Sequence, residues 1–96
     1  MKSTFNKPVL DLTATGKQIR ALRNRSGISV RTMQSLFSFP SPQSIYNWEA
    51  GKNMPTIDNL IVLSQIFGEP LENIVCTKKV QIEIEKVEKI RKRISA

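Results

Sequence analysis

Residues 29–52 read SVRTMQSLFSFPSPQSIYNWEAGK, and this stretch decides the fold. It predicts two short helices joined by a tight turn. Ser29 is a good N-cap for the first helix, and Pro40 ends it because a proline pushes the preceding residue out of the helical region. The second helix begins at Pro42 with Ser41 as its cap, since the first helical position tolerates a missing N–H.

Each of these two helices has an apolar face that can pack against the other. Met33, Leu36 and Phe37 lie at helical spacing on the first helix. Ile45 and Trp48 form the inward pair of the second helix. Two such helices across a tight turn predict a helix-turn-helix, in which the second helix turns its polar face outward.

That outer face is small and polar, because it carries Ser41, Gln43, Ser44 and Asn47. A Gln or Asn amide donates and accepts hydrogen bonds at once, so each can pair with N6 and N7 of adenine in the major groove. The plainer alternative is that these residues are solvated polar positions of an ordinary helix.

Further helices are expected on both sides of this pair. A capping box at residues 15–18 starts a helix that ends at Gly27. Thr56 caps a fourth helix that stops at Gly68, and Pro70 opens a short fifth one. Because no segment of residues 13–77 alternates with period two, the fold class is expected to be all-α, a compact five-helix domain.

The chain is divided into an N-terminal arm (1–12), a helix-turn-helix domain (13–77) and a basic tail (78–96). The tail has a strand-like alternation at Val80, Ile82 and Ile84. It also has a helical stripe made of Val80, Ile84, Val87, Ile90 and Ile94. Glu85 with Lys89 and Glu88 with Lys92 favour helix, so an amphipathic helical tail is predicted. A frayed basic extension is the alternative.

The composition excludes several classes of function. The 96 residues make one domain, with no His and a single Cys, Cys76, and the four glycines are widely spaced. The sequence therefore lacks the usual general base, the residues of a Cys-based zinc site and a phosphate-binding loop. For this reason no enzyme, cofactor or metal is expected. There is no membrane span and no secretory signal near the N-terminus, which predicts a cytoplasmic protein without membrane contact.

The charge points to a polyanion partner. The formal net charge is +7 at a sequence pI of about 10.0. A small basic protein of this kind is a candidate for nucleic-acid binding. The charge is uneven, with net +3 in residues 1–77 and net +4 in residues 78–96, so charge alone cannot separate a DNA-binding face from a solvated tail.

Three stretches of the sequence together resemble the lambda-repressor-like, Cro-type helix-turn-helix family, also called the XRE family. They are residues 28–37, 45–52 and 55–60. The most specific of them is Ile-x-x-Trp-Glu-x-Gly-Lys at residues 45–52. The resemblance covers residues 15–75, and it implies a DNA-binding domain whose recognition helix enters the major groove.

The resemblance also implies roles for single residues. Gln43, Ser44 and Asn47 occupy the base-facing positions of the family. Arg23 and Glu49 match a pair that forms a buried ion pair in the family. Contacts to DNA phosphates are expected from Arg31, Ser41, Tyr46, Lys52 and Asn53.

The turn departs from the family pattern. Residues 38–41 fill a space that usually holds three residues, and Ser38 stands where a glycine is usual. A serine in the left-handed region costs about 1 kcal/mol, so the extra residue could give a different turn. Pro42 replaces a polar residue at the start of the recognition helix.

These features predict a sequence-specific DNA-binding transcriptional regulator, a repressor that binds double-stranded DNA as a homodimer on a palindromic operator. The alternative is a protein-interaction module on the same fold, such as an antitoxin that binds a toxin partner through residues 78–96. A strong salt dependence of DNA binding favours the first function, and co-purification with a second small protein favours the other.

Overall fold

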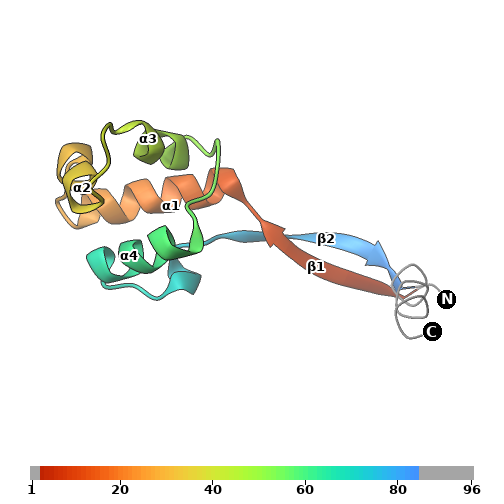
Figure 1. Ribbon diagram of the computed structural model, residues 1–96. Coiled ribbons are helices and arrows are strands. Elements are labelled where there is room, and N and C mark those ends of the chain that lie inside the picture. Colours follow the sequence, from red (N-terminus) through yellow and green to blue (C-terminus); the bar gives the residue numbers. More distant parts are fainter. Residues whose placement is uncertain (1–2, 85–96) are drawn as a thin grey trace.

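The computed structural model describes residues 3–84. The helices pack together at one end of the molecule, and the two strands leave them side by side as a long ribbon (Figure 1). In chain order the elements are β1 (Thr4–Leu10), α1 (Leu12–Arg25), α2 (Val30–Leu36), α3 (Gln43–Glu49), α4 (Ile57–Phe67), the 3₁₀ helix η1 (Leu71–Asn73) and β2 (Thr77–Glu83).

This architecture agrees with a helix-turn-helix but corrects the all-α, five-helix expectation. The fifth helix is the short 3₁₀ helix η1, which Pro70 precedes. Strands β1 and β2 form an antiparallel two-stranded sheet in which Thr4 lies opposite Glu83 and Leu10 lies opposite Thr77. The described residues therefore contain four α-helices, one 3₁₀ turn and a β-ribbon.

The helix expected at the start of the basic tail is a strand instead. Val80 and Ile82 belong to β2, so the alternating pattern prevails there over the helical stripe. The reason is that β2 pairs with β1 from the opposite end of the chain, and local spacing does not show such a partner. The later members of the stripe, Val87, Ile90 and Ile94, lie outside the described residues.

The start of α1 also differs from the capping box expected at residues 15–18. The helix begins at Leu12, and the Asp11 side chain caps it by accepting a hydrogen bond from Ala14 N at 3.0 Å. Thr15 is buried instead. Its hydroxyl accepts from Cys76 N at 2.9 Å and donates to Cys76 O at 3.4 Å. Thr15 thus ties α1 to the segment that enters β2.

The helices share one apolar core. Each fully buried Ile, Leu or Met side chain stabilises such a core by about 1.5–3 kcal/mol. Leu36 was expected on the inner face of α2 but is 54% exposed, because Met33 alone fills the buried position of this short helix. The buried apolar residues are Ile19, Leu22, Met33, Ile45, Trp48, Leu60, Leu63, Phe67 and Ile74.

Helices α1 and α3 approach each other closely at Gly16. A Cβ atom at this position would lie 2.4 Å from Trp48 O and 2.8 Å from Glu49 O. Gly51, at φ +73°, makes a second close approach, since its Cβ would lie 2.9 Å from Thr13 Cα. The two glycines let the C-terminal end of α3 rest directly on the first half of α1.

We expect Gly16→Ala to lower the free energy of unfolding by about 1–3 kcal/mol, because the added methyl group would overlap the two carbonyl oxygens of α3. The measurement is urea unfolding followed by circular dichroism. Lys17→Ala, at an exposed position of the same helix, is the control and should change stability by less than about 0.5 kcal/mol.

Helix propensity acts in the opposite direction, since alanine is about 1 kcal/mol better than glycine inside a helix. A Gly16→Ala protein that is as stable as the wild type, or more stable, would therefore show that α1 and α3 do not touch there.

Candidate nucleic-acid interface

The interface is built on the turn between α2 and α3. Ser29 caps α2, as the sequence predicts, and its hydroxyl accepts from Thr32 N at 3.0 Å. Ser38 adopts φ 56°, so it takes the left-handed conformation that a glycine usually provides. The backbone then turns back on α2, where Phe39 N donates to Gln34 O at 3.1 Å and Gln34 Nε2 donates to Phe39 O at 3.2 Å.

Three aromatic rings fill the space behind this turn. Phe37 and Phe39 stack with centroids 5.0 Å apart. Both meet the Trp48 ring edge to face, at 5.4 Å and 5.8 Å. Such pairs contribute about 0.5–1.5 kcal/mol each beyond the area they bury. The turn thus sends Phe39 back against Trp48, and the cluster holds α3 against α2.

Helix α3 begins one residue later than the sequence predicts. Pro42 is the N-cap rather than the first helical residue, and it makes no capping hydrogen bond through its side chain. Ser41 Oγ accepts from Gln43 N at 3.4 Å, a distance at which the bond is weak.

The outer face of α3 brings together the residues expected to face the bases. Gln43 and Ser44 are exposed and Asn47 is partly exposed. Gln43 Nε2 donates to Asn47 Oδ1 at 2.9 Å, so the two amides form one linked pair along the helix. Tyr46 stands on the flank of α3 and is 51% exposed.

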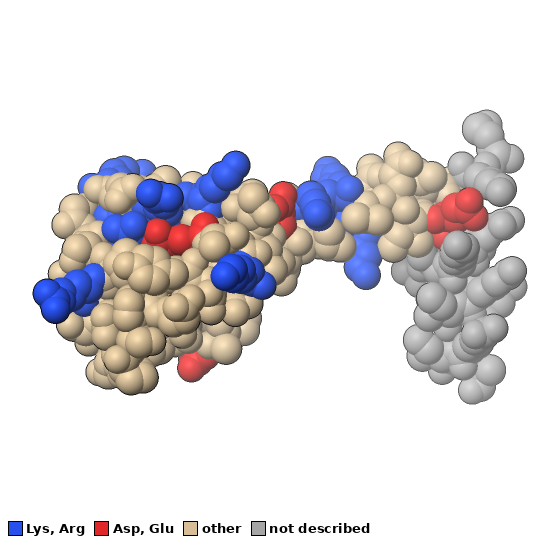
Figure 2. Space-filling view, turned by 90° about the horizontal axis from the view of Figure 1, so that it is seen from above, with Lys and Arg blue, Asp and Glu red and all other residues tan. Residues whose placement is uncertain are grey.

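The residues expected to contact phosphates come from three segments. Arg31 is exposed at the second position of α2, and Ser41 is exposed before α3. Lys52 and Asn53 are exposed in the loop after α3, where Lys52 N donates to Asn47 O at 2.9 Å. Figure 2 views the side that carries α3, where Lys and Arg side chains surround a small acidic patch and recur along the ribbon.

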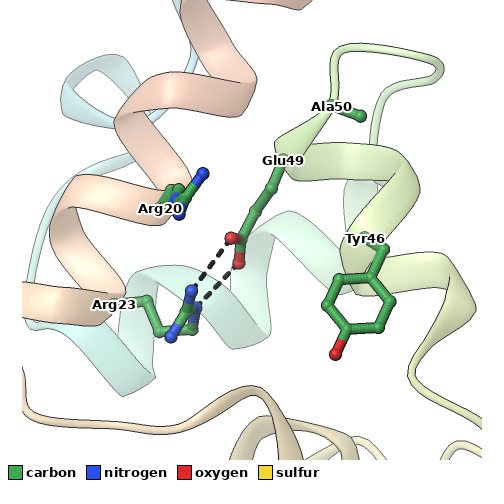
Figure 3. Close-up of a pocket in the computed structure, with 5 residues that line it drawn as sticks. All are labelled: Arg20, Arg23, Tyr46, Glu49 and Ala50. Carbon is green, nitrogen blue, oxygen red and sulfur yellow. Dashed lines mark hydrogen bonds and ion pairs between the residues drawn. The ribbon is translucent and has the colours of Figure 1, made fainter.

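One ion pair joins α1 to the end of α3 (Figure 3). Arg23 Nε and Nη2 donate to the two Glu49 carboxylate oxygens at 2.8 Å and 3.0 Å, and Arg23 Nη1 donates to Ile28 O at 3.1 Å. The side chains of Arg23 and Glu49 are only 12% and 9% exposed. By accepting these bonds, Glu49 raises the pKa of Arg23, so the guanidinium stays charged.

The pair forms one wall of a shallow open depression of about 350 Å³ that Arg20, Tyr46 and Ala50 also line. In Figure 3, Arg20 lies on α1 beside the ion pair, and Tyr46 lies on α3 on the other side of the Glu49 side chain. The sequence interpretation did not single out Arg20. Arg20 could have been found from its position, because it lies three residues before Arg23 and residues at this spacing share one face of a helix.

Residues 3–84 contain no group of three or more His, Cys, Asp or Glu side chains that could hold a metal ion. None of their helices combines the length and the apolar character needed to cross a membrane.

The comparison with protein families identifies the chain. A profile of the helix-turn-helix family matches residues 19–74, more than half of the sequence. The chain belongs to the helix-turn-helix family. The match confirms the XRE-type resemblance that rests on the motif at residues 45–52. No curated protein sequence matches the chain.

Two solved structures resemble this helix-turn-helix protein. One is the S. venezulae BldD DNA-binding domain, with a TM-score of 0.57 and 20% identity over 68% of this chain and 96% of that chain. The other is the crystal structure of the DNA-binding domain of BldD, with a TM-score of 0.58 and 20% identity over 68% of this chain and 93% of that chain. At this identity the similarity shows the fold alone.

A double-mutant cycle on Arg23 and Glu49 should show strong coupling. Removing one member of a buried ion pair leaves the other charge unpaired and costs about 3–5 kcal/mol, so each single alanine variant should be severely destabilised. The double variant Arg23→Ala with Glu49→Ala should be less destabilised than the sum of the two. Thermal and urea unfolding of the four proteins measures the coupling.

The matched control is Arg25 with Glu69, whose closest atoms lie 2.6 Å apart although Arg25 is 64% exposed. Hydrogen bonds from Asn73 and Arg25 lower the pKa of Glu69, but solvent screens this pair. Its coupling should stay below about 1 kcal/mol. Equal coupling in the two pairs would contradict a special role of the Arg23 pair.

Proposed function

We propose that this protein is a sequence-specific DNA-binding transcriptional regulator that inserts α3 into the major groove and represses transcription. The observation that carries the proposal is the linked pair of amides, Gln43 and Asn47, on the exposed face of the second helix of the motif. Membership of the helix-turn-helix family supports it, as do the solved relatives, whose names describe DNA-binding domains.

The chemistry of the two amides suits base recognition. Gln43 uses one N–H for Asn47 and keeps its oxygen and a second N–H, while Asn47 keeps both N–H groups. The bond between them restricts both side chains before DNA arrives, which lowers the entropy lost on binding. Each bidentate contact with adenine discriminates against other bases by about 1–3 kcal/mol.

The surrounding cations and polar groups suit the phosphates. Arg31 is exposed on α2 and Lys52 is exposed in the loop after α3, so we infer that they contact phosphates on the two sides of the groove. Ser41, Tyr46 and Asn53 add hydrogen-bond donors around the same helix. Such contacts give affinity that falls with salt and carries no sequence information.

The length of α3 supports a homodimer on a palindromic site. The helix has seven residues and spans about 10 Å, which covers roughly three base pairs. One copy therefore reads a short half-site. Two copies related by a two-fold axis read two half-sites about one helical turn apart and so reach the specificity of a regulator.

We expect Gln43→Ala to weaken binding to the preferred duplex by about 5- to 150-fold while binding to random DNA changes little. Lys52→Ala should weaken binding to both duplexes equally and reduce the slope of log K against log salt by about one. The measurement is fluorescence anisotropy over a salt series, with a duplex selected from a random pool by the purified protein.

Gln65→Ala is the matched control, because Gln65 is an exposed glutamine on α4, outside the motif. It should bind as the wild type does. If Gln43→Ala leaves the ratio of specific to random binding unchanged, α3 does not read the bases.

A reporter gene tests repression. Its promoter contains the selected sequence, and its expression should fall when the protein is produced.

A further inference from the structure

The ribbon of β1 and β2 has one face that is mostly apolar. Residues opposite each other in an antiparallel pair point to the same side, and successive residues alternate. Four of the six side chains on this face are therefore apolar, and the six are Phe5, Lys7, Val9, Lys78, Val80 and Ile82. Phe5 is 49% and Val80 is 44% exposed, so this face is not covered within the described residues. The opposite face carries Thr4, Asn6, Pro8, Leu10, Thr77, Lys79, Gln81 and Glu83.

A ribbon of this kind needs a further partner. An isolated two-stranded sheet is marginally stable at best in water, and independent stability takes three or more strands with an apolar face or packing against a helix. In Figure 1 the ribbon runs away from the helices, so the helical domain does not cover it along most of its length. An added strand has to enter at one of the two outer edges.

The outer edge of β1 is closed to a further strand. Hydrogen-bonded and non-bonded pairs alternate along an antiparallel ladder. Asp11 N donates to Cys76 O and Ile84 N donates to Ser3 O, which places Pro8 at a non-bonded position of the register. The nitrogen of Pro8 therefore faces outward. Because it has no hydrogen, it interrupts the outer edge of β1 in the middle of the strand.

The outer edge of β2 is open. By the same alternation, the backbone N–H and C=O groups of Thr77, Lys79 and Gln81 point away from β1. No proline interrupts β2, and within residues 3–84 no other segment pairs with this edge. Unpaired edge groups of this kind are a template for another strand.

We propose that a second copy of this chain occupies this edge, with β2 pairing antiparallel to β2 around a two-fold axis. The result is a four-stranded sheet in the order β1, β2, β2, β1, with the two apolar faces joined into one. The outer strands are then the two β1 strands, whose edges Pro8 already closes, so the assembly stops at two copies. The inference rests on the proposed function for its two-fold symmetry, but its test needs no DNA.

The register follows from the strand itself. Two seven-residue strands overlap most fully when their central residue, Val80, lies opposite its own copy. Lys79 then faces Gln81 of the second copy, and the two Lys79 side chains do not face each other, which would be unfavourable. On the apolar face the two Val80 side chains meet at the axis, with Lys7 of each copy on the outer strand.

The test compares two prolines that lie opposite each other on the ribbon. Gln81→Pro removes an outward N–H from the edge of β2, and Asn6→Pro removes one from the edge of β1, so neither breaks a bond between the two strands. Gln81→Ala controls for the lost side chain. Analytical ultracentrifugation of the full chain gives the mass, and circular dichroism confirms that each variant keeps its helices.

We expect the wild type, Gln81→Ala and Asn6→Pro to have twice the 10.9 kDa mass of one chain. Gln81→Pro should raise the dissociation constant of the dimer about 100-fold, because the two-fold axis places two prolines in the interface. A dimeric Gln81→Pro protein overturns the proposal. An equal loss of dimer in Gln81→Pro and Asn6→Pro also overturns it. A monomeric wild type also overturns it.

A disulfide tests the register. In the background of Cys76→Ser, Val80→Cys places two cysteines at a non-bonded pair, with Cα atoms about 4.5 Å apart and within reach of a disulfide. Lys7→Cys is the control, since the two copies of residue 7 would lie three strand spacings, about 14 Å, apart. Cross-linking of Val80→Cys alone supports the proposal, and cross-linking of Lys7→Cys alone contradicts it.

Discussion

The contact between the first half of α1 and the end of α3 is the constraint on which the rest of the interface depends. Gly16 lets the Trp48 and Glu49 carbonyls approach α1 closely, and a side chain at this point would force the helices apart. The ion pair of Arg23 with Glu49 then locks the same end of α3 from the other side. With one end held by α1, the opposite, amide-bearing face of α3 can only point outward.

The turn between α2 and α3 holds the other end of the helix. Ser38 adopts a left-handed conformation, and the turn places Phe39 against Trp48. Trp48 is therefore shared by the turn cluster and by the α1 contact, which couples the two supports of one short helix. A seven-residue helix is too short to be stable alone, so its orientation comes from these contacts rather than from its own propensity.

The sequence predicted the features of the fold that depend on residues close together along the chain. Ser29 as a cap, the inward pair of Ile45 and Trp48, and Gly68 as a helix stop are local signals, and each has the predicted place in the structure. Helical spacing also predicted that Gln43 and Asn47 share a face, whereas their contacts with bases remain a prediction. The ribbon could not be predicted this way, because β1 and β2 come from opposite ends of the chain. The same long-range contact explains Thr15, whose hydroxyl binds Cys76 instead of capping α1.

The central claim is that α3, held between α1 and the turn, is the surface that meets DNA. Nuclear magnetic resonance of the ¹⁵N-labelled protein, titrated with a duplex selected from a random pool, tests it directly at each backbone amide. The account predicts the largest shift changes at residues 43–47, with further changes at Arg31 and Lys52. Changes confined to β1 and β2 or to α4, with the amides of α3 unmoved, would contradict it.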